Sequence, residues 1–232
     1  MKLLNLIALL SIAILMQSPL HAAEDIELRL GDSLKGKESF YRDIYRKSRT
    51  RLESFAKKHG WEGLLNEPFI KRIEIYDGKE AYDQMLRTIY PELKNKTIPK
   101  TFAAGIEKGV YFSVSPAVYA RIYPQGEDPD AFEKLFTHEL AHRLHVRILD
   151  GDEERMGPIW FFEGFATIAS GQFEKNKADL SAEEIAKLLD QKERGSYLKY
   201  NKLLKHFLKK HTLKELVERA GDKDFQSWLT EK

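Results

Sequence analysis

Cysteine is absent from the 232 residues, and neither sign of charge dominates, because 38 lysines and arginines stand against 36 aspartates and glutamates. Without cysteine the chain has no disulfide, no lipidated N-terminal cysteine and no thiol that could act as a nucleophile or a metal ligand. A formal net charge of only +2 is not typical of proteins that bind nucleic acid. Histidines and carboxylates are therefore the groups in which to look for chemistry.

Long hydrophobic runs are also missing beyond the N-terminus. Residues 3–16 form an uncharged, mostly apolar run after Lys2, and Ala22 and Ala23 follow it. This order is typical of a secretory signal peptide, so we expect residues 1–23 to be removed. An uncleaved membrane anchor is the alternative, although the run is shorter than the roughly 20 residues of a membrane-spanning helix. The mature chain is expected to have no stable membrane span.

The pattern His-Glu-x-x-His occurs at His138, Glu139 and His142. On a helix, two histidines four residues apart lie on one face, where their imidazoles can share one Zn²⁺ at about 2.0–2.1 Å. Glu139 points to the side and can reach a metal-bound water without binding the metal. The alternative interpretation is a surface helix with two solvated histidines.

The residues around this pattern predict a helix. Asp128 suits the N-cap, Pro129 suits the first helical position, and apolar residues follow at helical spacing. We expect this helix over residues 129–148. An acidic loop then turns the chain, and a second helix is expected to begin near Pro158.

Glu163 is the only charged residue between positions 159 and 170. A helix that is apolar on all sides should be buried, and a buried carboxylate is costly unless a cation accompanies it. A metal ion is a suitable cation, and two histidines, one glutamate and a water form the ligand set of a catalytic zinc site. An exposed glutamate, or a buried one paired with arginine, is the alternative.

These motifs resemble those of the gluzincin metallopeptidases, and are most similar to the peptidase MA-like domains of bacterial envelope proteins. The resemblance covers residues 68–232. It implies one zinc ion per chain, bound by His138, His142 and Glu163, with Glu139 as general base. The signal-peptide pattern of residues 1–23 predicts a periplasmic or secreted protein. The inner-membrane anchor stays as the alternative. The related aminopeptidases carry a G-x-M-E-N signature that is missing from residues 101–106, so exopeptidase action is not implied.

A third histidine follows on the same face of the predicted helix. In metzincin peptidases a glycine stands at the position of His145, and the third metal ligand stands at the position of Ile148. Seven residues of helix separate His145 from His138 by about 10.5 Å, so one metal ion cannot bind all three histidines. His145 is expected either beside the site, at the pocket wall or next to a metal ligand, or away from it, in ordinary packing or in solvent.

The predicted fold is α+β, with a small antiparallel or mixed sheet, the helix that carries the histidines, and a mainly helical second half. Residues 24–67 are expected to form an N-terminal segment whose amphipathic helix spans residues 37–58, ahead of the peptidase domain. Strands are expected at residues 69–76 and 109–115. In gluzincins an edge strand binds the substrate backbone, and residues 109–115 are our candidate, with a central strand as the alternative.

The predicted function is hydrolysis of peptide bonds in peptide or protein substrates by a zinc-activated water. The resemblance assigns the donor that stabilises the oxyanion to Tyr200, with Tyr197 and His206 as the other possibilities. The alternative function is that of a catalytically weak or inactive envelope protein that binds peptides or a partner.

Overall fold

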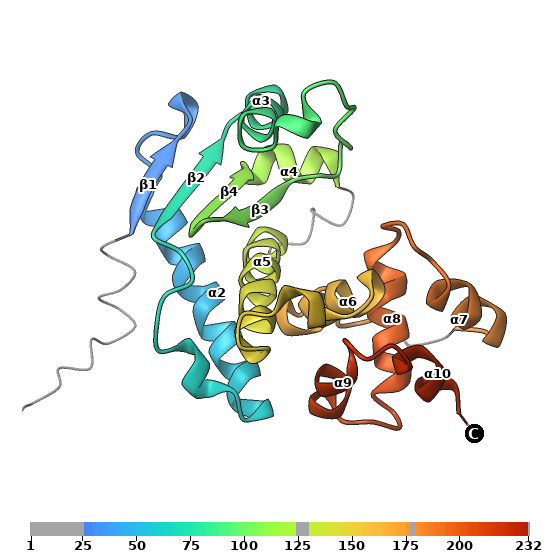
Figure 1. Ribbon diagram of the computed structural model, residues 1–232. Helices are drawn as coiled ribbons and strands as arrows, with labels where there is room; N and C mark the ends of the chain where they lie inside the picture. Colours follow the sequence, from blue (N-terminus) through green and yellow to red (C-terminus); the bar gives the residue numbers. More distant parts are fainter. Residues whose placement is uncertain (1–25, 124–129, 177–179, 232) are drawn as a thin grey trace, which may run out of the picture.

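The computed structural model describes residues 26–123, 130–176 and 180–231, and in them the chain folds as α+β (Figure 1). The fold class predicted from the sequence is confirmed at this level. The expected signal peptide and the expected capping residues Asp128 and Pro129 lie outside the described residues. Within the described ranges, no helix has both the length and the apolar character that a membrane span requires.

The described strands form one mixed sheet in the order β1-β2-β4-β3. β1, β2 and β4 are parallel neighbours, whereas β3 is antiparallel to β4. The two predicted strands are found as β2 and β4, and neither β1 nor β3 has a counterpart among the predictions. The strands are β1 Glu27–Leu30, β2 Arg72–Tyr76, β3 Ala104–Glu107 and β4 Val110–Val114.

The prediction that residues 109–115 form the edge strand is wrong. β4 is an inner strand, paired with β2 on one side and with β3 on the other. Only Lys108 and Gly109 connect β3 to β4, and both have positive φ angles, 48° and 76°. A two-residue turn of this kind matches the twist of a tight hairpin. β3 therefore folds back beside β4 and becomes the edge strand next to helix α5 (Figure 1).

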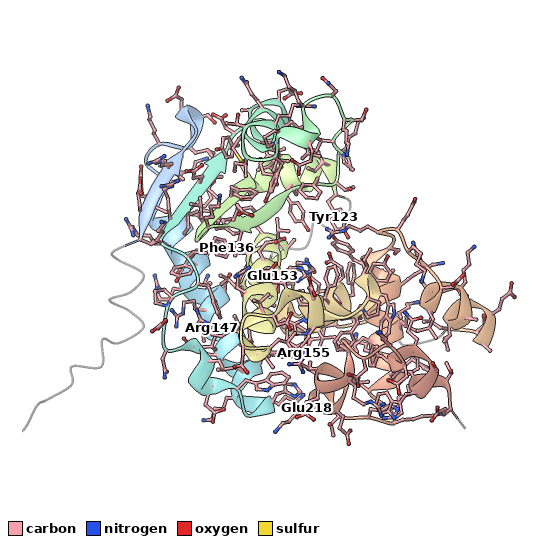
Figure 2. The ribbon with its side chains drawn as sticks, viewed as in Figure 1. Tyr123, Phe136, Arg147, Glu153, Arg155 and Glu218 are labelled. Atoms are coloured by element: carbon pink, nitrogen blue, oxygen red, sulfur yellow. The ribbon has the colours of Figure 1, made fainter. Side chains whose placement is uncertain are left out.

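Helices cover both faces of the sheet. On one face lies Phe136 of α5, which is labelled in Figure 2. The ring of Tyr111 in β4 stacks on Phe136 with centroids 3.7 Å apart, and Tyr45 of α2 packs on it as well. On the other face, Tyr82 of α3 contacts the ring of Phe112. The helices of this half are α2 Glu38–His59, α3 Lys79–Ile89, α4 Pro116–Ile122 and α5 Ala131–Ile148.

The second half of the described chain is helical, as predicted. α6 lies between α5 and α8, and its apolar residues are buried on several sides. The helices are α6 Ile159–Ser170, α7 Ala182–Leu189, α8 Tyr197–Phe207, α9 Leu213–Arg219 and α10 Phe225–Thr230. Short 3₁₀ turns in the described residues include η1 Asp32–Leu34, η2 Glu62–Leu65, η3 Pro91–Leu93 and η5 Glu153–Met156.

The N-terminal segment is part of the same core. The helix predicted at residues 37–58 is found as α2, and β1 pairs with β2. The Ser48 hydroxyl of α2 donates to the carbonyl of Glu133 in α5, and Arg51 lies 2.8 Å from the Glu133 carboxylate. The buried residues of α2, α5 and α6 belong to one hydrophobic cluster. The segment predicted at residues 24–67 thus packs into the same hydrophobic cluster as the residues that follow it.

Candidate metal centre

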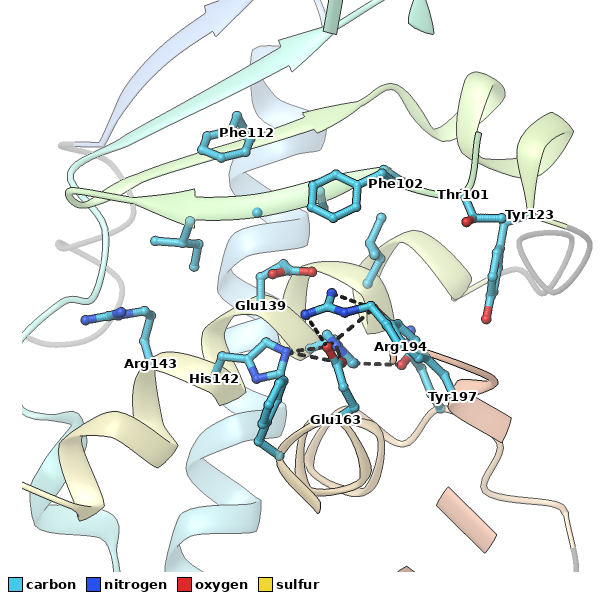
Figure 3. A pocket seen from close by; sticks show the side chains of 18 of the residues that line it. Thr101, Phe102, Phe112, Tyr123, Glu139, His142, Arg143, Glu163, Arg194 and Tyr197 are labelled. Atoms are coloured by element: carbon cyan, nitrogen blue, oxygen red, sulfur yellow. Dashed lines mark hydrogen bonds and ion pairs between the residues drawn. The ribbon is translucent and has the colours of Figure 1, made fainter. Parts of the chain in front are cut away.

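The structure brings His138, His142 and Glu163 together where α6 crosses α5 (Figure 3). The Nε2 atoms of the two histidines are 3.1 Å apart, and Glu163 Oε2 lies 3.0 Å from His138 Nε2 and 3.5 Å from His142 Nε2. Ligand atoms bound tetrahedrally to one metal ion at about 2.0–2.2 Å are separated by about 3.3–3.6 Å, so the three atoms are within a few tenths of an ångström of that arrangement. The three predicted ligands are thus placed so that they could hold one ion.

The other side of the His138 ring is held by Gln172, which follows α6. His138 Nδ1 lies 2.9 Å from Gln172 Oε1. An amide oxygen only accepts hydrogen bonds, so Nδ1 carries the proton of the neutral ring and Nε2 presents a lone pair. That lone pair faces His142 Nε2 and Glu163 Oε2. A cation between these three atoms would meet a histidine whose tautomer is already fixed by a partner, as in other metal sites.

The two oxygens of Glu163 have different partners. Oε2 faces the histidines, whereas Oε1 lies 3.1 Å from Arg194 Nη2 and accepts from the Tyr197 hydroxyl at 3.4 Å. Arg194 Nη1 also donates to the Tyr197 oxygen at 3.1 Å, and the Tyr197 ring stacks on His138. The arginine partner that the sequence allowed for a buried glutamate therefore occurs together with the histidine group.

Burial and charge act in opposite directions on this group. Glu163 is only 1% exposed, which by itself would raise the pKa of its carboxyl, but the nearby imidazoles of His142 and His138 hold that pKa below its usual range. Burial would lower the pKa of His138, and the carboxylates of Glu163 and Glu139 raise it instead. Glu163 is therefore an anion in the folded protein, which suits a metal ligand.

Glu139 is next to His138 in the sequence but points elsewhere. Figure 3 shows its carboxylate between strand β3 and the ligand group, at the wall of the cavity. Among the described residues, none forms a hydrogen bond or an ion pair with Glu139. A carboxylate in this position can accept a proton from a molecule in the cavity without first leaving a partner.

The cavity in front of the ligand group has a volume of about 470 Å³. It lies between β3, the helices α5 and α6, and the segment that leads into α8. Aromatic side chains form much of its wall, namely Tyr90, Phe102, Phe112, Tyr119, Tyr123, Phe162 and Tyr197. Such a cavity has the size and the apolar lining of sites that bind small molecules or short peptide segments.

Strand β3 presents a free edge to this cavity. Gly105 pairs with Phe112 and Glu107 with Val110, and the Ala103 carbonyl accepts from the Val114 amide at 2.9 Å. In an antiparallel ladder, alternate residues direct their backbone groups to the partner strand. The backbone groups of Ala104 and Ile106 therefore point away from β4, along the edge that borders the cavity.

The structure does not bring all predicted residues to the cavity. Tyr200 is 1% exposed and its hydroxyl is bonded to the backbone of Gly195 and Glu193, so it is not among the lining residues. His206 does not line the cavity either. Tyr197, one turn before Tyr200 on α8, does line the cavity, and its hydroxyl lies 3.4 Å from Glu163 Oε1.

His145 packs inside the protein. Its ring stacks on Phe165 with centroids 4.4 Å apart, and the edge of Phe161 approaches it. No described residue forms a hydrogen bond with either ring nitrogen. Burial, assisted by the charge of His142, lowers the pKa of His145 to about 3. Of the two roles left open by the sequence, the structure supports packing.

Two residues of the site could not be identified from the sequence. Gln172 and Arg194 come from segments outside helices, and neither belongs to a recognisable motif. Comparisons with family models, curated proteins and solved structures gave no match to this chain. The functional proposal below therefore depends on the geometry of the site.

Proposed function

We propose that this protein is an exported, zinc-dependent metallopeptidase of the gluzincin type, with one zinc ion held by His138, His142 and Glu163. One observation supports it above the others. The helix that carries both histidines also directs an unpaired carboxylate, Glu139, into the cavity beside the ligand group. A purely structural metal site has no need of a free base at that position.

The donor set alone does not select zinc, because two histidines and one carboxylate also suit non-haem iron. Zinc is proposed because hydrolysis needs a base next to the attacking water, and Glu139 is placed for that task. When bound, zinc supplies a positive charge that polarises a carbonyl and lowers the pKa of a water to about 7.

The protein's own residues would carry the proton and the developing charge. Glu139 accepts a proton as water attacks the scissile carbonyl, and then passes it to the leaving amine. Tyr197, whose hydroxyl lies 3.4 Å from Glu163, turns that hydroxyl towards the oxyanion of the tetrahedral intermediate. We assign this role to Tyr197 rather than Tyr200, because the Tyr200 hydroxyl is bonded to backbone groups.

The free edge of β3 supports an extended peptide as the substrate. A peptide laid along this edge would form main-chain hydrogen bonds with Ala104 and Ile106, and its side chains would meet the aromatic wall. β3 thus takes the substrate-binding role that the sequence analysis gave to residues 109–115. Export rests on residues 1–23, which are proposed to direct the protein to the periplasm or out of the cell.

The proposal is tested with zinc-loaded protein and a peptide library read by mass spectrometry. The wild type should cleave a subset of peptides, whereas Glu139→Gln should retain zinc and lose about 10²–10⁴ in kcat. When wild-type protein is stripped of zinc and loaded with iron instead, cleavage should not return. If wild-type protein with a full zinc content cleaves none of the peptides but binds some, the alternative of an inactive peptide-binding protein replaces the proposal.

A further inference from the structure

Two arginines line the cavity within the described residues, and their surroundings differ. Arg143 pairs with Glu153 at 3.1 Å, and the Glu153 side chain is 64% exposed. Figure 3 shows Arg143 pointing away from the ligand group. Arg194 instead pairs with Glu163, which is 1% exposed, while its own side chain stays 48% exposed at the cavity. Arg194 is thus the cation that faces both the ligand group and the open space.

The guanidinium of Arg194 can accommodate a further anionic partner. Its side chain stays 48% exposed although it pairs with the buried Glu163. A negative group in the cavity would be attracted both by this guanidinium and by the proposed metal ion. Arg194 uses Nη2 for Glu163 and Nη1 for Tyr197, which leaves other N–H groups for such a partner.

We propose that Arg194 binds an anionic oxygen of the substrate, and this inference rests on the peptidase function proposed above. The oxygen has two possible sources, the C-terminal carboxylate of a short peptide or the scissile carbonyl oxygen when it becomes an oxyanion. Guanidinium groups are well suited to either, since they form paired, charge-assisted hydrogen bonds with oxyanions. In the first case the enzyme removes residues from C-termini, and in the second Arg194 contributes to the rate on any peptide.

A binding experiment tests the first source without turnover. Zinc-loaded Glu139→Gln protein is titrated by calorimetry with N-acetyl-alanyl-phenylalanine and with its C-terminal amide. Carboxylate recognition predicts that the acid binds roughly ten- to a hundredfold more tightly than the amide. In the same Glu139→Gln background, the additional substitution Arg194→Gln should abolish this preference for the acid. Arg194→Lys in its place should keep part of the preference, and the matched control Arg143→Gln should keep all of it.

A kinetic experiment tests the second source with a long peptide amidated at its C-terminus. An oxyanion contact predicts that Arg194→Gln lowers kcat about ten- to a hundredfold with little change in KM. Zinc content is measured in each variant. The inference is overturned if Arg194→Gln changes neither experiment, or if it only reduces the zinc content, since Arg194 would then merely support Glu163. If no peptide is cleaved but the acid preference depends on Arg194, the proposed function fails and the inference stands.

Discussion

The Nδ1 atom of His138 and the side-chain oxygen of Gln172 are 2.9 Å apart, and the loop that carries Gln172 is itself held firmly. The Lys205 ammonium donates to the carbonyl of Phe173 at 3.0 Å, and the buried Asn201 amide donates to the Gln172 carbonyl at 3.3 Å. Phe173 has a φ angle of 55°, which few non-glycine residues adopt. The contacts from α8 keep this loop in a conformation that orients His138.

We expect Gln172→Ala to weaken zinc binding by about 10- to 100-fold, because the His138 ring loses the acceptor that fixes its tautomer. Gln172→Glu, which keeps an acceptor oxygen, should retain most of the affinity. The affinities are measured by competition with a chelator of known strength. The exposed Gln84→Ala on α3 is the matched control, and equal affinities for Gln172→Ala and this control would contradict the assignment.

We expect Tyr197→Phe to lower kcat by about 10²–10³ while zinc content and KM change little, because the hydroxyl acts on an oxyanion that exists only in the transition state. Tyr200→Phe should keep nearly wild-type kcat and lose about 1 kcal/mol of stability, since its hydroxyl bonds the backbone at residues 193–195. Steady-state kinetics on one cleaved peptide separates the two variants. If Tyr200→Phe lowers kcat instead and Tyr197→Phe does not, the role belongs to Tyr200.

We expect Gly164→Ala to destabilise the protein by about 1–3 kcal/mol, because α6 and α8 approach closely at this residue. A Cβ atom there would lie 3.1 Å from the Tyr200 carbonyl oxygen and 3.1 Å from Leu204 Cβ. The backbone oxygen cannot move without α8, which also carries Tyr197. Gly63→Ala, where a Cβ atom meets open space, is the control in urea unfolding. Equal midpoints for the two variants would count against this packing.

His145 makes the stability of the protein dependent on pH. Its pKa is about 3 in the folded protein and about 6.5 when the chain is unfolded, so below pH 6.5 the unfolded state binds the extra proton. The free energy of unfolding should therefore fall by up to about 1.4 kcal/mol per pH unit between pH 6.5 and pH 3. His145→Phe keeps the stacked ring and removes this loss.

The measurement is urea unfolding of chelator-treated wild type and His145→Phe at pH 7 and pH 5, because zinc binding has a pH dependence of its own. The drop in stability from pH 7 to pH 5 should be smaller in the variant by about 2 kcal/mol. Parallel drops in both proteins would show that His145 does not remain neutral in the folded state.

Local spacing was sufficient to predict the three side chains that the structure brings together. His138 and His142 share a helix face by periodicity alone, and Glu163 stood out as a lone charge in an apolar helix. The residues that depend on tertiary packing were not predictable in this way. Tyr197 and Tyr200 are three residues apart on the side of α8 that packs against α6, so the pattern could not tell which hydroxyl reaches the cavity. Gln172 and Arg194 reach the site only because α6 and α8 bring their adjoining segments there.

The fold shows the same division. β2 was visible as an alternating segment and β4 as a run rich in aromatic and β-branched residues. Ala104–Glu107 has little β-forming character and is a strand because it pairs with β4. The dipeptide of Lys108 and Gly109 was the available signal, since two residues ending in glycine between apolar segments predict a hairpin. Had this dipeptide been read as a hairpin turn, β3 rather than β4 would have been predicted as the edge strand.

If the proposed metal ion binds at Glu163, the burial of α6 links its binding to folding. Glu163 comes from a helix enclosed by α5 and α8, so its carboxylate meets the two imidazoles only when the whole core is assembled. Metal ions that bind only the folded chain stabilise it by mass action, by about 2.7 kcal/mol at a concentration one hundred times the dissociation constant. The backbone amide of Glu163 should then exchange its hydrogen only through global unfolding. The availability of zinc where the chain folds would thus set how long each molecule survives proteolysis.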